Sequence, residues 1–431
     1  MPSFGIETLL DLAALPWDRA TSRAATLARF SLLDWMACGM AGRQEPLAEK
    51  LRALAEAEGG RPVASVIGGP KAPARMAALV NGATSHALDY DDTHFAHVGH
   101  LSVAIYPAAL AAAEEMDLSA GDAIAAFLVG AEGAIRVGEM LGRAHYNLGF
   151  HQTATSGAFG ATMAAGRIYG LNRDEMRAAL SLCATRASGL KSQFGTMGKP
   201  YNAGIAASNG VECATLARLG FKSADDGLMG PQGFAATHTP KVWFTGPPDA
   251  FLFEDNKYKL HACCHGTHAM IEALLACGVR LDQVAAISLR TNPRWLRVCD
   301  IKRPRTGLEV KFSYAWIAGM VLRGDATGDD RAYHDALAED AALTAFAKRV
   351  EVIGDERVTD LKAMGYLHLT DGTQIPLQHD LAEPMADATL ARRLQHKAEA
   401  MLGADGAALW AMLDGLDALP ARKIGGRLGS V

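Results

Sequence analysis

The sequence predicts a mainly α-helical protein, with a large all-helical domain and a smaller α+β domain. Two observations carry this prediction across the 431 residues. Apolar residues recur at helical spacing through the first part of the chain, whereas short runs rich in β-branched residues appear only in the later part. Helical spacing then returns near the C-terminus. We therefore expect a helical domain over residues 1–270, completed by a C-terminal helix over about 400–431, and an α+β domain over 271–399.

The helices of the first domain are predicted from alanine- and leucine-rich segments with clear start signals. Residues 21–40 place apolar side chains at the spacing of a buried helix face. Ser119 with Asp122, and Asn172 with Glu175, each match a capping box before an apolar run. Each pair therefore predicts the start of a helix.

Small residues crowd several of these helices, as in SGAFGATMAAG (156–166) and NAGIAASNG (202–210). Small side chains let two helix backbones approach closely, so we expect a compact bundle of buried helices. Strand-like alternation is weak in this part of the chain, with RPVASVIGG (61–69) as a faint exception.

The predicted α+β domain begins with β-branched runs at 283–291 and 349–354. Residues 365–377 alternate around Asp371-Gly372, a dipeptide that favours a tight hairpin turn. Helical spacing resumes at 388–402. These patterns predict a small sheet with a hairpin, followed by C-terminal helices.

Composition excludes several classes of function. The net charge is −5 and there is no lysine- or arginine-rich tract, so we expect no nucleic-acid partner. The longest apolar stretch, 123–141, is interrupted by Glu132, Arg136 and Glu139, so we expect no membrane span. The seven cysteines are an odd number and mostly isolated, and the N-terminus lacks a basic leader. Reduced thiols in a cytoplasmic protein are the simplest interpretation.

Polar residues concentrate in HALDYDDTHFAHVGHLS (86–102), and a metal site is one hypothesis for this stretch. Its histidines recur at every third position, a spacing that only an irregular loop could bring together. A second stretch, HACCHGTH (261–268), matches no familiar zinc spacing and places two cysteines side by side. Acid–base work without a metal is the competing hypothesis, and we expect no metal. The candidate ligands are Asp89, Asp91, Asp92, His94, His97 and His100 in the first stretch, and His261, Cys263, Cys264, His265 and His268 in the second.

Proton-carrying side chains stand at four predicted helix entrances. His100 precedes Ser102, which is a plausible N-cap, and His151, Lys199 and Lys259 each precede a helical segment. A helix N-terminus exposes unpaired N–H groups and partial positive charge, so it favours anions. If several of these entrances converge, they could hold a small di- or tricarboxylate.

Six segments together resemble the MmgE/PrpD family: NGATSHALDYDDTH, GHLSVAIYPAALAAAEE, GFHQTATSGAFGA, FGTMGKPYNAGIAASNG, KLHACCHGTHAMIEAL and TGLEVKFSYAWIAGMVLRG. The family includes 2-methylcitrate dehydratase, cis-aconitate decarboxylase and iminodisuccinate epimerase. The resemblance implies a large helical domain with a small lid domain, a homodimer, and a reaction that needs no metal or other cofactor.

The resemblance also implies a cleft of named residues. Its histidine loop normally continues with Pro-Ser, whereas here Leu101 takes the place of the proline. Decarboxylase-like members carry a tyrosine where this chain has Trp316, with Tyr314 two residues away. This departure weighs against decarboxylation. The expected catalytic residues are Asp89, His100, His151, Lys199 and Lys259, and the expected substrate-binding residues are Thr93, Ser102, His94, His97, Tyr314 and Trp316.

The family's reactions share a step that makes or quenches carbanion character beside a carboxylate, which requires cations and an acid–base pair. From the sequence we expect a lyase that dehydrates a hydroxy-polycarboxylate of the 2-methylcitrate type. An epimerase or isomerase of an iminodisuccinate-type dicarboxylate is the alternative, with a cis-aconitate decarboxylase-like enzyme after it. A catalytically idle carboxylate-binding member is the hypothesis from outside enzymes, although all six matched polar positions are retained.

Overall fold

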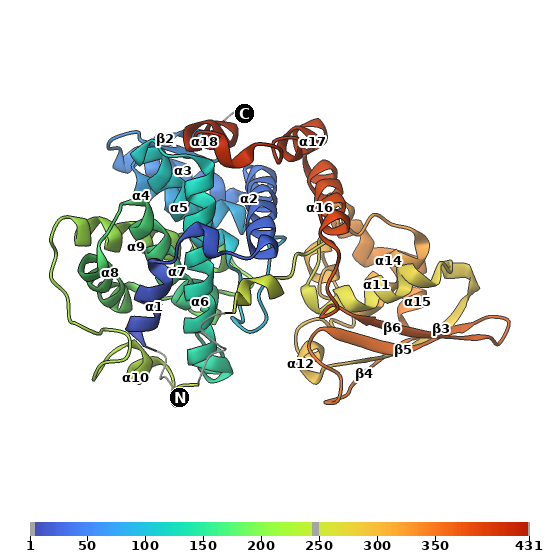
Figure 1. Cartoon of the computed structure of the whole chain (residues 1–431). Coiled ribbons are helices and arrows are strands. Elements are labelled where there is room, and N and C mark those ends of the chain that lie inside the picture. The colour runs from blue at the N-terminus through green and yellow to red at the C-terminus, as the bar shows by residue number, and fades with distance from the viewer. Residues whose placement is uncertain (1–4, 244–249, 430–431) are drawn as a thin grey trace. The chain divides into compact units, whose positions relative to one another are not determined.

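The computed structural model describes residues 5–243 and 250–429, and the chain divides into two units. One unit holds the residues up to Tyr258 together with those from Leu402 onward, and the other holds Lys259–Met401. The division falls after Tyr258, earlier than the expected boundary at residue 270. Figure 1 shows that the first unit is helical and that the second contains a sheet. The mainly helical fold class with a separate α+β unit is confirmed.

The helical unit is built around long helices that are buried on most sides. The helices α5, α7 and α9 carry almost no exposed apolar side chain, as expected for segments rich in alanine and glycine. Its helices are α1 (Ile6–Ala13), α2 (Ser22–Gly42), α3 (Pro46–Glu58), α4 (Ala74–Ser85), α5 (Ser102–Met116), α6 (Ala120–Leu148), α7 (Gln152–Ile168), α8 (Arg173–Arg186), α9 (Gly198–Arg218), α10 (Phe234–His238), α17 (Ala404–Trp410) and α18 (Ala421–Gly429), with 3-10 turns η1 (Trp17–Arg19), η2 (Lys191–Gln193), η3 (Leu252–Asp255) and η8 (Leu416–Ala418).

Both predicted capping boxes are present in this unit. The Ser119 side chain accepts from the Asp122 backbone at the start of α6, and Asn172 does the same for Glu175 at the start of α8. The faint strand pattern at 61–69 corresponds to a small antiparallel pair, β1 (Ala64–Val66) and β2 (Gly69–Ala72). The C-terminal segment completes the unit, because the Leu428 carbonyl accepts a hydrogen bond of 2.9 Å from Gly68 N.

Close helix contacts depend on glycine, as the crowding of small residues predicted. A Cβ on Gly82 in α4 would lie 2.9 Å from the Cα of Gly204 in α9. A Cβ on Gly204 would overlap the backbone oxygen of Leu79. A backbone atom cannot rotate away as a side chain can, so these two helices tolerate nothing larger than glycine at this crossing.

Replacing Gly204 with alanine is therefore expected to lower the free energy of unfolding by about 2–3 kcal/mol, because overpacking against a backbone forces the helices apart. Gly426→Ala in α18 is the matched control, since an added Cβ there meets nothing within 4 Å. The control should be neutral or slightly stabilising. Urea unfolding of both variants checks this, and equal stabilities would contradict the packing argument.

The α+β unit contains one four-stranded sheet in the order β4-β3-β5-β6. The pairing of β3 with β4 is parallel, and the other two pairings are antiparallel. The predicted hairpin is confirmed, with Gly372 at a φ of 87° in the turn. Helix α11 packs against β5 and β6. The elements are η4 (His265–Thr267), α11 (His268–Cys277), η5 (Leu281–Gln283), β3 (Val284–Thr291), α12 (Pro293–Leu296), α13 (Gly307–Val310), α14 (Tyr314–Arg323), η6 (Asp330–Ala332), η7 (Asp335–Glu339), α15 (Ala341–Ala347), β4 (Val350–Gly354), β5 (Lys362–Leu369), β6 (Gln374–Asp380) and α16 (Asp387–Leu402).

Candidate active site

The candidate site is centred on the loop 86–101, which joins α4 to α5. The loop is anchored to a neighbouring segment, because Thr93 and Lys257 exchange backbone hydrogen bonds of 2.7 and 2.9 Å. It also closes on itself, since His94 N donates to Gly99 O over 2.9 Å. Asp89 and Val98 both have positive φ, at 52° and 56°. A β-branched residue rarely adopts this conformation, so surrounding contacts must hold Val98 in place.

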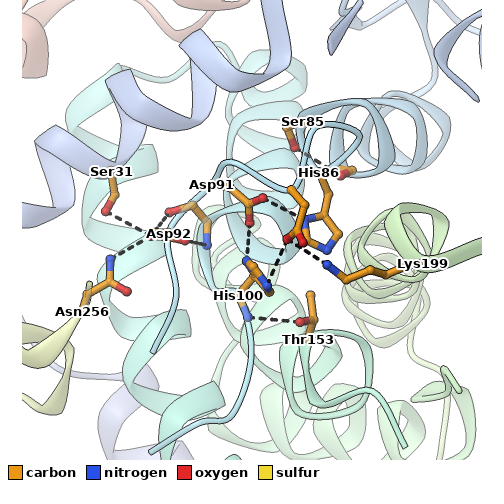
Figure 2. A network of polar contacts seen from close by, with 12 residues as sticks. Ser31, Ser85, His86, Asp91, Asp92, His100, Thr153, Lys199 and Asn256 are labelled. Carbon is orange, nitrogen blue, oxygen red and sulfur yellow. Dashed lines mark hydrogen bonds and ion pairs between the residues drawn. The ribbon is translucent and has the colours of Figure 1, made fainter. Parts of the chain in front are cut away.

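Four polar side chains of this loop meet one another. Asp91 bridges two histidines, with Oδ1 2.8 Å from His86 Nδ1 and Oδ2 2.7 Å from His100 Nδ1. His100 Nε2 lies 3.6 Å from Asp89 Oδ1 on its other side. Thr153 Oγ1 accepts a 3.0 Å hydrogen bond from His100 N, which fixes the backbone of that residue (Figure 2). The loop thus presents an alternating chain of imidazoles and carboxylates.

A lysine from another part of the chain completes the cluster. Lys199 Nζ lies 2.8 Å from Asp89 Oδ1. Lys199 belongs to the first turn of α9, where the positive end of the helix dipole adds to its charge. The ammonium also lies 5.7 Å from the centre of the Phe194 ring.

His151 stands beside this cluster at the N-terminus of α7. Its ring centre lies 6.2 Å from that of His86 and 5.0 Å from that of Phe194. Asn202 Nδ2 lies 3.2 Å from His151 Nδ1 and also donates to the Leu190 carbonyl. Because the amide nitrogen is a donor, His151 Nδ1 must accept, and the proton of the neutral ring sits on Nε2.

Burial and charge set the protonation states of these groups. Burial lowers the pKa of His86 to about 4, and Asp91 opposes this only in part. Burial, followed by the Lys199 charge, holds the pKa of His151 well below its usual range. Burial alone would raise the pKa of Asp91, but His100 and His86 outweigh it and hold that pKa well below its usual range. At neutral pH, His86 and His151 are therefore neutral and Asp91 is ionised.

The structure brings together four of the five residues expected to be catalytic: Asp89, His100, His151 and Lys199. The fifth, Lys259, lies in the α+β unit, where it is buried. Three of the four predicted helix entrances, at α5, α7 and α9, therefore meet within the helical unit.

Three residues expected to bind substrate have other roles in the structure. His94 is buried, and its Nε2 lies 2.9 Å from the Leu252 carbonyl. His97 is also buried, with Nδ1 3.2 Å from the Ala134 carbonyl. Ser102 is the first residue of α5 rather than its N-cap, and its hydroxyl donates to Asp92 over 2.5 Å. These contacts give all three side chains a structural role inside the loop, and substrate binding by them stays a prediction.

Thr93 keeps its place as a candidate. Within the described residues, its Oγ1 is buried and has no hydrogen-bond partner. A buried hydroxyl without a partner is costly, so a ligand that supplied one would stabilise it.

The two aromatic candidates belong to the core of the α+β unit. The Tyr314 hydroxyl donates to the Gly266 carbonyl over 2.8 Å, and Trp316 Nε1 donates to the Leu337 carbonyl over 3.1 Å. Both side chains are buried there. Substrate contact by these two residues stays a prediction, and in the structure their polar donors already bind backbone carbonyls.

Three of the six candidate metal ligands in the stretch 86–102, Asp89, Asp91 and His100, lie together in the structure. The other three, Asp92, His94 and His97, are used elsewhere, and Asp92 anchors Ser102 and Asn256. Among the described residues, one group of His86, Asp89, Asp91 and His100 offers ligand atoms within 4.8 Å of one another. Both histidine Nδ1 atoms in that group already face Asp91, and the Lys199 ammonium already balances Asp89. The group is therefore suited to acid–base work.

The stretch 261–268 is likewise built into the fold. His261 contacts Thr327 and Glu272 over 2.9 Å each. All seven cysteines are free thiols, which agrees with the simple interpretation of the sequence. In the part of the chain that the structure covers, every helix falls short of the length and apolar character of a membrane span.

Two residues of the cluster were not predicted as catalytic from the sequence. His86 was not a candidate at all, and Asp91 was a candidate only as a metal ligand. Burial raises the pKa of Asp92, the residue next to Asp91 in the loop. Asp92 caps the start of α5. The sequence does hold one signal that separates the two aspartates. Successive side chains in an extended segment point to opposite sides, so the adjacent Asp91 and Asp92 are expected to have different partners.

Comparison with known proteins covers both units. A model of the MmgE/PrpD N-terminal domain matches residues 12–245, and a model of the MmgE/PrpD C-terminal domain matches residues 261–412. The chain belongs to the MmgE/PrpD family. This confirms the resemblance that the six segments suggested.

Several curated MmgE/PrpD relatives are similar to this chain. A cis-aconitate decarboxylase-like protein of Aspergillus oryzae is 32% identical over 57% of this chain and 56% of its own length. The cis-aconitate decarboxylase of Homo sapiens is 30% identical over 59% of this chain and 56% of its own length. The mitochondrial 2-methylcitrate dehydratase of Yarrowia lipolytica is 25% identical over 44% of this chain and 40% of its own length. The matched part of this chain thus spans 56% of the length of the first two relatives and 40% of that of the third.

Proposed function

We propose that this MmgE/PrpD chain is a cofactor-independent lyase that decarboxylates a small tricarboxylate of the cis-aconitate type. Relatives named as cis-aconitate decarboxylases or as decarboxylase-like are 29–32% identical to it, whereas the relative named as a dehydratase is 25% identical. We therefore place decarboxylation ahead of dehydration, which reverses the order that the sequence favoured. We no longer count the replacement of the expected tyrosine by Trp316 against decarboxylation, because the Trp316 side chain is buried in the core of its unit.

The observation that carries the proposal is the Lys199–Asp89 pair with His100 and His151 beside it. A carboxylate is attracted by the Lys199 ammonium, by the positive end of the α9 dipole, and by a neutral His151 that presents Nε2–H. Asp89 keeps the ammonium in place until the substrate arrives. This arrangement supports recognition of an anion with several carboxylates.

The chemistry follows from the same atoms. When the C–C bond to one carboxylate breaks, CO₂ leaves and the electron pair remains on carbon, delocalised through the neighbouring double bond toward a second carboxylate. Lys199 balances that charge. Its ammonium is mostly buried, so it stabilises the developing anion more strongly than it would in water. A proton from His100 Nε2 then adds to carbon, and His100 recovers a proton from water. Asp91 and Asp89 balance the charge of the imidazolium while it carries the proton.

The test is incubation with cis-aconitate, citrate and 2-methylcitrate in turn. Release of CO₂ from cis-aconitate, with loss of the conjugated-acid absorbance, is the expected result. No CO₂ from cis-aconitate contradicts the decarboxylase. Unsaturated acid formed from citrate or 2-methylcitrate would instead establish the dehydratase, the second candidate, which the Yarrowia lipolytica relative favours.

Two further outcomes identify the remaining hypotheses. Exchange of hydrogen for deuterium at a carbon next to a carboxylate, without net product, would indicate an epimerase or isomerase. Binding of a tricarboxylate without exchange or turnover would indicate an idle family member. Isothermal titration and proton NMR make both measurements.

Chelation is expected to leave the rate unchanged. The charge that a divalent ion would supply beside Asp89 is already supplied by Lys199 at 2.8 Å. Initial rates before and after dialysis against EDTA check this, with added Zn²⁺ and Mg²⁺ as a second arm. A rate that falls on chelation and returns with either ion would refute the metal-free mechanism.

A further inference from the structure

We propose that Asp91, supported by His86, is a positioning residue that selects Nε2 of His100 as the reacting nitrogen. The inference rests on the proposed function, because it explains how one histidine of that site is prepared for proton transfer. Asp91 is fully buried and lies on the far side of His100 from Asp89. It therefore acts through His100 and makes no contact with substrate.

The tautomer of His100 follows from the charge of Asp91. An ionised carboxylate can only accept hydrogen bonds, and its charge repels a nitrogen lone pair, so the proton of each neutral ring is favoured on the nitrogen beside Asp91. His86 Nδ1 meets the carboxylate in a hydrogen bond, whereas the contact of His100 Nδ1 is one of charge and distance. His100 Nδ1 lies 2.7 Å from Oδ2, and His86 Nδ1 lies 2.8 Å from Oδ1. A neutral His100 consequently carries its proton on Nδ1 and exposes the lone pair of Nε2 toward Asp89.

His86 holds the carboxylate in this orientation. Its backbone is the C-cap of α4, and its side chain is fully buried. The His86 ring centre lies 4.5 Å from that of His100, so the two rings are in contact, and Asp91 bridges their Nδ1 atoms from one side (Figure 2). Within the described residues, His86 Nε2 has no hydrogen-bond partner, so Nδ1 carries its polar contact. The role of His86 is therefore to donate one hydrogen bond to Asp91.

The arrangement gives His100 and His151 opposite tautomers. His151 Nδ1 accepts from Asn202, which leaves its proton on Nε2, whereas His100 has its proton on Nδ1. One imidazole thus offers a donor and the other an acceptor at the corresponding ring position. Fixing both tautomers in advance avoids a reorganisation during each turnover.

The neighbouring carboxylate shows that the position of Asp91 is specific. Asp92 is equally buried, but it binds Ser102 and the Asn256 amide, which lies 2.8 Å away. Asp92 therefore anchors the start of α5, and only Asp91 faces the two histidines.

The first test is kinetic and uses three variants of the full chain: Asp91→Ala, His86→Ala and His86→Asn. Asp91→Ala should lower kcat by about 100-fold with KM changed less than about 3-fold, since tautomer control affects the chemical step. His86→Ala should lower kcat by roughly 10-fold, as for other residues that orient a ligating or catalytic histidine. His86→Asn should recover most of that loss, because the asparagine amide can replace Nδ1–H as the donor to Asp91.

The second test is independent of substrate. Histidine labelled with ¹⁵N reports which ring nitrogen carries the proton, with His100 identified by comparison with His100→Gln. The neutral ring of His100 should be protonated at Nδ1 in the parent chain, and Asp91→Ala should populate both tautomers.

The outcomes separate this inference from the proposed function. A parent His100 protonated at Nε2, or an Asp91→Ala variant with unchanged kcat, overturns the positioning role. His86→Asn as slow as His86→Ala overturns the part assigned to His86. If the parent chain releases no CO₂ from cis-aconitate but shows the Nδ1–H tautomer, the proposed function fails and the positioning role stands.

Discussion

Replacing Lys199 with alanine is expected to lower kcat/KM for the tricarboxylate substrate by roughly 1,000-fold, because a preorganised charge beside the developing anion is removed. Lys199 Nζ lies 2.8 Å from Asp89 and sits in the first turn of α9. Its loss also leaves the Asp89 carboxylate without that partner, so a like charge then faces the substrate. Both effects weaken transition-state binding in the same direction. Initial rates across a range of substrate concentration measure the loss.

Lys191→Ala is the matched control for this substitution. Lys191 lies in η2, close in sequence, but its ammonium donates to the Tyr146 carbonyl over 3.1 Å and lies 3.7 Å from the centre of the Tyr146 ring. We expect that variant to keep a rate within about 3-fold of the parent, as for surface changes away from a site. Near-normal turnover by a folded Lys199→Ala variant would contradict the proposal that the ammonium stabilises the developing anion.

Acid is expected to destabilise the fold steeply between pH 6.5 and pH 4. Burial lowers the pKa of His86 and His145 to about 4 and that of His97 to about 3, and it holds the pKa of His151 well below its usual range. In the unfolded chain these imidazoles titrate near pH 6.5. As the pH falls through this window, the unfolded state therefore binds up to four protons that the folded state does not.

One buried acid works against this trend. Burial raises the pKa of Glu132 to about 7, so the folded state binds a proton there before the unfolded state does. For these four histidines and Glu132 together, the net difference is near three protons, which corresponds to a slope of about 4 kcal/mol per pH unit at its steepest. Burial also holds the pKa of His268 well below its usual range, which acts in the same direction as the four histidines. Stability from the four histidines is fully present above pH 6.5 and is lost as the pH falls toward 4.

Urea unfolding at intervals from pH 7.5 to pH 4.5 checks this prediction. His97→Gln should flatten the slope by about one proton, or roughly 1.4 kcal/mol per pH unit. A free energy of unfolding that stays level between pH 6.5 and pH 5 would contradict neutral burial of these rings.

Local patterns were sufficient for most of the fold. The capping boxes at Ser119 and Asn172, the glycine-dependent helix contacts and the Asp371-Gly372 hairpin were all expected from a few neighbouring residues. Such features depend on backbone hydrogen bonds and side-chain spacing within one element or one turn, which the order of residues states directly.

The site was only partly predictable, because local patterns identify helix starts but not contacts between distant segments. Helix starts can be recognised locally, so His100, His151 and Lys199 could be named without a structure. Ser102 was misplaced by one residue at its helix start, because Asp92 supplies the acceptor that a capping serine otherwise provides. Tyr314 and Trp316 were chosen by position in a motif, which says nothing about whether a side chain is buried.

The sequence by itself determined the helical character of the larger unit, the family, and which helix starts carry ionisable groups. Only the tertiary structure decided which residues of the stretch 86–102 stabilise the loop and which belong to the candidate site. His94 and His97 turn inward to backbone carbonyls, whereas His86 and His100 meet across Asp91. The physical reason is that a histidine's role depends on its burial and its partner at Nδ1, and loop geometry sets both. The spacing of residues along a loop specifies neither.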